Sequence, residues 1–88
     1  MLNGNPTLAD IELPDTVDNE VTFCTSHSSY ALRNSSQGTW HLVRIERLVP
    51  RVTHLLHVRG HEWVAAPVDA GRNVHSPDWR DALRRVIT

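Results

Sequence analysis

The chain has 88 residues, a formal net charge of −1 and nine basic residues, all of them arginine. A chain of this length folds as one domain with a thin core, because it buries only about 60% of the surface exposed when unfolded. It has no 18-residue apolar run and no basic segment leading into an apolar one, so neither a membrane span nor a secretion signal is expected.

The N-terminal part of the chain is acidic. Residues 1–20 contain five acidic side chains and no basic one, whereas residues 21–88 hold all nine arginines and five acids. Pro6, Pro14 and a scatter of small polar residues predict an extended arm over residues 1–19, followed by a single domain over 20–88. The arm's acids make it a candidate partner-binding element: Asp10, Glu12, Asp15, Asp18 and Glu20.

Ordering such an arm costs about 1–2 kcal/mol per residue in backbone entropy, so it needs a surface to cover. That surface is either the arginine-bearing body of the same chain or a neighbouring molecule. We expect the neighbouring molecule, and therefore that deleting residues 1–19 abolishes assembly with little loss of monomer stability.

Five segments have the β-branched, aromatic or alternating composition of strands: 21–25, 30–33, 39–48, 52–58 and 62–68. In the third, Trp40, Leu42 and Arg44 share one face, while His41, Val43, Ile45 and Arg47 share the other. Both faces are partly apolar, which predicts a central strand.

A helix is expected at the C-terminus, with Ser76 as its N-cap and Pro77 in its first position. An apolar stripe at helical spacing follows, made of Trp79, Ala82, Leu83, Val86 and Ile87. The predicted fold is therefore α+β, a small antiparallel sheet of four or five strands with this helix packed on it.

Four residues have spacings seen in zinc sites. Cys24 and His27 are separated by two residues, and His57 and His61 flank a predicted turn. Zinc takes four thiolate or imidazole ligands, usually as two close pairs from different segments. The two pairs form a candidate metal site. The alternative is that the histidines lie on the sheet without a ligand and that the chain uses no cofactor.

The segment Gly60-His61-Glu62-Trp63, together with Cys24-x2-His27, resembles a degenerate zinc ribbon. In that family a cysteine pair precedes a glycine and an aromatic residue soon follows. The sequence departs from the pattern because Leu56 and Arg59 stand where the ribbon cysteines would fall. The resemblance covers about forty residues and implies a small nucleic-acid-binding module.

A second candidate site is basic. Arg44, Arg47, Arg51 and Arg59 lie close together in sequence, and Trp40 and Trp63 offer aromatic surfaces for stacking on bases or packing on a partner. The alternative is a solvated arginine face, since the isoelectric point is near 6.6.

An enzyme is not expected, because the glycines are isolated and no orienting carboxylate accompanies Cys24 and His27. The sequence favours a non-enzymatic binding or assembly module, an accessory subunit of a larger protein or nucleoprotein complex; a homo-oligomer stays open. The alternative is the ribbon-like nucleic-acid binder. A single cysteine is typical of a protein from a reducing compartment, and the use of arginine with no lysine is typical of a GC-rich genome. Together they predict a bacterial cytoplasm or a phage particle.

Overall fold

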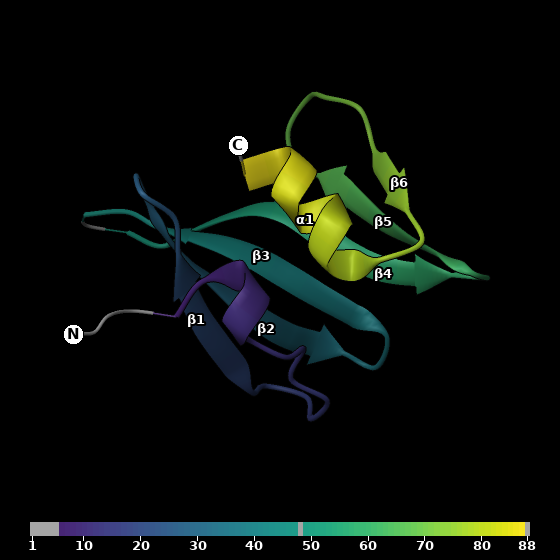
Figure 1. Ribbon diagram of the computed structural model, residues 1–88, viewed down its shortest axis with the longest axis horizontal. Helices are drawn as coiled ribbons and strands as arrows, with labels where there is room; N and C mark the ends of the chain where they lie inside the picture. The colour runs from purple at the N-terminus through teal and green to yellow at the C-terminus, as the bar shows by residue number, and fades with distance from the viewer. Residues whose placement is uncertain (1–5, 48, 88) are drawn as a thin grey trace.

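The structure, a computed structural model, describes residues 6–47 and 49–87. Six antiparallel strands lie side by side in sequence order, and a one-turn 3-10 helix and one α-helix lie on the same face of the sheet (Figure 1). The elements are η1 (Leu8–Asp10), β1 (Glu20–Cys24), β2 (Ser29–Ser36), β3 (Thr39–Ile45), β4 (Arg51–Arg59), β5 (Glu62–Pro67), β6 (Val74–Ser76) and α1 (Trp79–Ile87).

The α+β class is confirmed, but the predicted four or five strands are six. The extra strand, β6, pairs with β5 through Trp63↔Ser76, Val64↔His75 and Ala65↔Val74. Three residues are too few to show an alternating pattern in the sequence. The strand forms because the open edge of β5 supplies its hydrogen-bonding partners.

The helix begins two residues later than predicted. Ser76 ends β6, and α1 starts at Trp79. Asp78 caps it, because its carboxylate accepts a hydrogen bond from the backbone N–H of Asp81 at 3.2 Å. Ser76 supports this cap: its hydroxyl accepts from the Asp78 N–H at 3.2 Å and donates to the Asp81 carboxylate at 2.8 Å.

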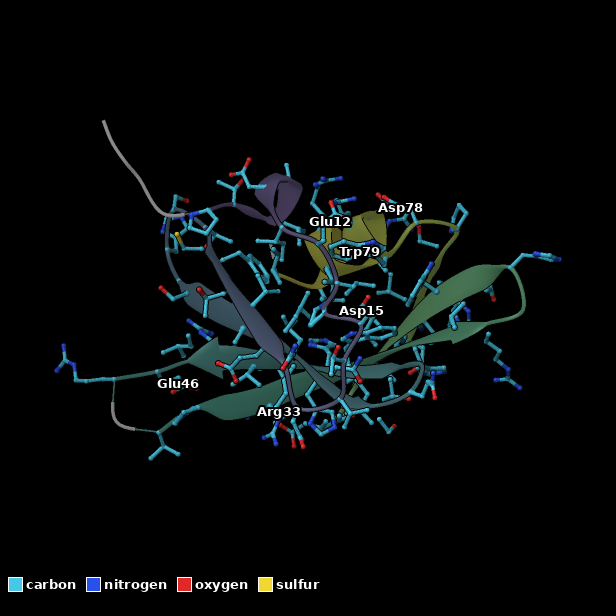
Figure 2. The ribbon with its side chains drawn as sticks, turned by 90° about the horizontal axis from the view of Figure 1, so that it is seen from below. Glu12, Asp15, Arg33, Glu46, Asp78 and Trp79 are labelled. Carbon is cyan, nitrogen blue, oxygen red and sulfur yellow. The ribbon has the colours of Figure 1, made fainter. Side chains whose placement is uncertain are left out.

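The strand register places the core on one face of the sheet. Leu32 lies opposite Leu42, and Trp40 opposite Leu56. These residues belong to a buried cluster that also contains Leu83 of α1. We call this side of the sheet the covered face. Figure 2 shows it from the edge, with η1 and α1 on one side of the strands only.

The helix alone cannot cover this face. Nine residues of α-helix span about 13 Å, whereas six strands at about 4.8 Å spacing span about 24 Å. The α-helix packs over β5 and β6, so the half formed by β1 to β3 needs a second cover. The acidic arm provides it, running from η1 along the sheet past Asp15 (Figure 2).

The arm therefore packs on the body of its own chain, the first of the two surfaces considered above. Leu8 and Ile11 are only 7% and 4% exposed, and both belong to the core cluster. Burying side chains of this size contributes about 1.5–3 kcal/mol each, which offsets part of the entropy of ordering the arm.

Polar contacts fix the path of the arm over the sheet. The carbonyl of Pro14 accepts two hydrogen bonds, from the side-chain amide of Asn34 at 2.9 Å and from the indole N–H of Trp40 at 2.8 Å. Arg80 of α1 donates to the carbonyl of Ile11 at 2.6 Å and to the carboxylate of Glu12 at 2.7 Å. The two covers of the sheet are thus joined to each other.

Candidate functional site

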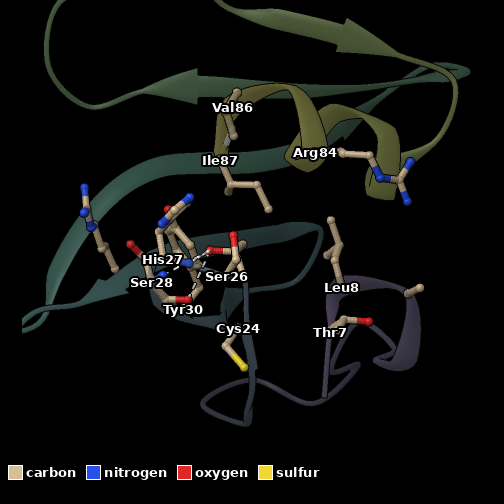
Figure 3. A pocket seen from close by; sticks show the side chains of 13 residues that line it. Thr7, Leu8, Cys24, Ser26, His27, Ser28, Tyr30, Arg84, Val86 and Ile87 are labelled. Carbon is tan, nitrogen blue, oxygen red and sulfur yellow. Dashed lines mark hydrogen bonds between the residues drawn. The ribbon is translucent and has the colours of Figure 1, made fainter. Parts of the chain in front are cut away.

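A groove lies between the two covers of the sheet. It has a volume of about 860 Å³ and lies between η1, the turn joining β1 to β2, and the C-terminal half of α1 (Figure 3). This volume falls in the range of ligand-binding sites, about 300–1,000 Å³. The groove arises because arm and helix approach the same face from different directions and leave a gap at one end of the sheet.

One wall of the groove is apolar. Leu8 comes from η1, Val86 and Ile87 come from the last turn of α1, and Ile87 extends into the gap above the β1–β2 turn (Figure 3). Val86 and Ile87 are half-buried. They continue the apolar stripe of the helix beyond the sheet, so part of their surface faces the groove instead of the core.

The opposite wall is the polar turn of residues 25–28. The hydroxyl of Thr25 accepts hydrogen bonds from the backbone N–H groups of His27 at 3.2 Å and Ser28 at 3.1 Å. The backbone N–H of Thr25 also donates to the carbonyl of Ser28 at 2.8 Å. These bonds hold the turn, while Ser26 and His27 are exposed at the groove.

Two arginines line the groove. Arg44 belongs to the covered face of β3, two residues beyond Leu42, and lies opposite Tyr30. Arg84 comes from α1. A second hollow of about 560 Å³ adjoins the groove, shares the residues around Cys24 and Arg44, and adds Arg47 and Glu46.

Four arginines, Arg33, Arg51, Arg80 and Arg85, each form an ion pair with a carboxylate. Within residues 6–47 and 49–87 the other five form none, and three of these five, Arg44, Arg47 and Arg84, line the groove or the second hollow. Together with His27 they give the groove and the second hollow an excess of basic side chains over the single acid, Glu46.

The four candidate zinc ligands are not brought together. Cys24 pairs with Ser29, which lies opposite Ile45 at one end of β3, whereas His57 lies opposite Thr39 at the other end. Six residues of strand separate these ends, which is about 20 Å. No group of three or more metal-binding side chains forms among the residues described. Cys24 and His27 instead line the groove.

The predicted basic site is divided. Arg44 and Arg47 reach the groove and the second hollow, but Arg51 pairs with Asp69, and Arg59 stands at the far hairpin. Trp40 is only 8% exposed, and its ring packs against that of Trp63 with 5.5 Å between centroids. Trp40 is therefore not available for stacking. The sequence could not predict this, because no local pattern shows that the arm covers Trp40.

The arm's acids serve mainly its own fold. Glu12 pairs with Arg80, and Asp18 pairs with Arg33. The backbone N–H and then the hydroxyl of Thr7 donate to Asp10, and these bonds lower the pKa of that carboxyl. Asp15 and Glu20 are exposed.

Sequence reasoning missed Leu8 and the last turn of α1 as parts of a site. One signal was available for Arg44, which follows Trp40 and Leu42 on the apolar face of its strand. An arginine in a core-facing position indicates either a buried ion pair or an opening in the cover.

Comparison of the chain with models of known families, with curated proteins and with solved structures finds no match. None of the helices in the described residues is long and apolar enough to cross a membrane. The case for a function therefore depends on the geometry and charge of the groove.

Proposed function

We propose that this protein is a non-enzymatic binding module, an accessory subunit that docks on a larger assembly by holding an acidic segment of a partner protein in the groove. The observation that carries the proposal is that Arg44, Arg47 and Arg84 line the groove or the adjoining hollow without carboxylate partners in the described residues. Arginine binds carboxylates through two parallel hydrogen bonds, so a lining with several such side chains suits an acidic ligand.

The other walls narrow the class of ligand. Leu8, Val86 and Ile87 offer apolar surface beside the arginines, and the turn offers the hydroxyls of Ser26 and Ser28. A segment that alternates acidic and apolar side chains would pair with the arginines and pack on the apolar wall at the same time. Apolar contact contributes affinity, and charge complementarity contributes specificity and association rate.

A protein partner is favoured over a nucleic acid. Non-specific binding of single strands relies on exposed aromatic rings for stacking. Tyr30, the aromatic residue of the groove, is 7% exposed and stacks on Phe23 at 5.5 Å. With Trp40 also buried, the groove offers charge but no platform for bases.

The proposal is tested by fluorescence anisotropy with a labelled peptide that alternates glutamate and leucine. Its glutamine analogue and a single-stranded oligonucleotide of equal charge serve as comparison probes. We expect the acidic peptide to bind, and the glutamine analogue to bind at least about tenfold more weakly, since hydrogen bonds to charged groups contribute about 1.5–3 kcal/mol.

Charge reversal supplies the matched controls. Arg84→Glu and Arg44→Glu are each expected to lower the affinity for the acidic peptide by about tenfold or more. Arg72→Glu, in an exposed loop, makes the same change in net charge and should leave binding near the wild-type value. Equal effects of all three variants would show a non-specific charge effect and contradict the proposal. Preference for the oligonucleotide, with a steep loss on adding salt, would replace it with nucleic-acid binding.

A further inference from the structure

The face of the sheet opposite η1 and α1 has its own apolar band. The register places Ala31 opposite Val43, Val43 opposite Val52, and Leu55 opposite Ala66 on this side. We call it the open face, defined by Ala31, Val43, Val52, Leu55, Val64 and Ala66 together with His41 and His57. Among residues 6–47 and 49–87, no helix or strand packs over it, as the edge view in Figure 2 shows.

The band is apolar but does not belong to the core. Ala31 and Val64 are buried between their neighbours, yet neither is part of the core cluster. Val43, Val52, Leu55 and Ala66 are half-buried, and Ile45 at the edge is 42% exposed. These side chains would bury further apolar area if a second layer packed on them.

Charged side chains border the band. Arg33 lies opposite His41 and pairs with Asp18, and His75 forms a hydrogen bond with Glu62 at 2.9 Å. The band between them contains no Asp, Glu or Arg, in contrast to the basic groove. Depletion of charged residues in the middle of a patch is typical of the buried centre of a protein interface.

We infer that two copies of the chain associate through their open faces, stacking sheet on sheet. Perpendicular to its shortest axis the whole molecule measures 40 × 26 Å. A standard interface takes about 800 Å² from each partner, so it would occupy most of this outline and would need the rim of the open face as well as its apolar band. Two faces without net charge in their centres approach without repulsion, and a two-fold contact lets the same patch serve both copies.

This inference goes beyond the proposed function and depends mainly on different residues; Ile45 alone of the tested positions also lines the second hollow, so Leu55→Glu is the substitution that separates the two proposals. In such a dimer the two grooves, on the covered faces, both stay accessible. The assembly would present two docking sites on opposite sides, so a partner array with repeated acidic segments would bind with avidity.

Light scattering coupled to size-exclusion chromatography tests the inference. At about 0.1 mM, above the micromolar dissociation constant expected of the weakest standard-size interfaces, the wild type should show twice the chain mass. Leu55→Glu places a charge in the middle of the open face and should give the mass of one chain. Ile45→Glu, at an exposed position on the same face, should shift the equilibrium toward monomer without disturbing the fold.

The matched control is Val58→Glu on β4. Val58 is 46% exposed, close to the value for Ile45, but it lies on the covered-face side, opposite Trp63. It should leave the dimer intact. A monomeric wild type at this concentration, or a dimer that survives both Leu55→Glu and Ile45→Glu in folded protein, would overturn the inference. Circular dichroism establishes that each variant is folded.

Discussion

The two faces of the sheet differ in how their apolar side chains are shielded from solvent. The covered face is closed by two elements of unlike character, an amphipathic helix and an acidic arm, which divide the sheet between them. The open face keeps small and branched side chains beside histidines and lacks a cover in the described residues. A nine-residue helix is too short for a six-stranded sheet, so the arm becomes part of the core.

The sharpest test of this division compares the two covers. Ile11→Ala in the arm and Leu83→Ala in α1 should each lower the free energy of unfolding by about 2–5 kcal/mol, because both remove fully buried side-chain volume. Urea denaturation followed by tryptophan fluorescence measures this. Val17→Ala, on the same arm but 47% exposed, should change stability by less than about 0.5 kcal/mol. If Ile11→Ala were as mild as Val17→Ala, the arm would not be part of the core.

A smaller effect is expected from the polar attachment of the arm. Trp40→Phe keeps most of the aromatic volume but removes the N–H that donates to the Pro14 carbonyl. The carbonyl retains its bond from Asn34, so the lost hydrogen bond should cost about 0.5–1.5 kcal/mol, to which the smaller ring adds lost packing against Trp63. Thermal denaturation of the two proteins in one buffer gives the difference. A change below the error of the midpoint would mean that the bond contributes nothing net.

The smallest effect concerns pH. His54 lies opposite Leu42 on the covered face, and burial lowers its pKa below the ordinary value of 6.5. The unfolded chain then takes up a proton more readily than the folded one, so stability is complete above about pH 6.5 and falls as the pH drops through that range. Thermal midpoints between about pH 5 and pH 8 should fall more on the acid side for the wild type than for His54→Gln. Parallel curves for both proteins would exclude this contribution.

Much of the fold could be predicted from the sequence because alternation and helical spacing are local properties. The strands around Trp40 and Leu56 and the helical stripe through Leu83 follow directly from them. β6 could not be predicted, because three residues carry no period. The packing of the arm on its own chain could not be predicted, because Leu8 and Ile11 are isolated apolar residues in a polar segment. Their place in the core follows only from comparing the length of α1 with the width of the sheet.

The sequence predicted separate parts of the candidate site but not that they form one site. Cys24 with His27, and Arg44 with Arg47, were singled out for two different chemistries, and the fold brings both pairs to one end of the sheet. Arg84 joins them only through the packing angle of α1 over the sheet, which no local pattern encodes. The apolar character of both faces of β3 and β4 also left open which face the helix would choose.

The pair of hydrogen bonds accepted by the Pro14 carbonyl also provides a way to measure local opening of the arm. The indole proton of Trp40 is shielded from solvent only while residue 14 stays in place. Its rate of exchange with deuterium therefore measures how often the arm lifts from the sheet, separately from global unfolding. A single resonance, well apart from the backbone amides, thus reports the opening equilibrium of the N-terminal cover in the intact protein.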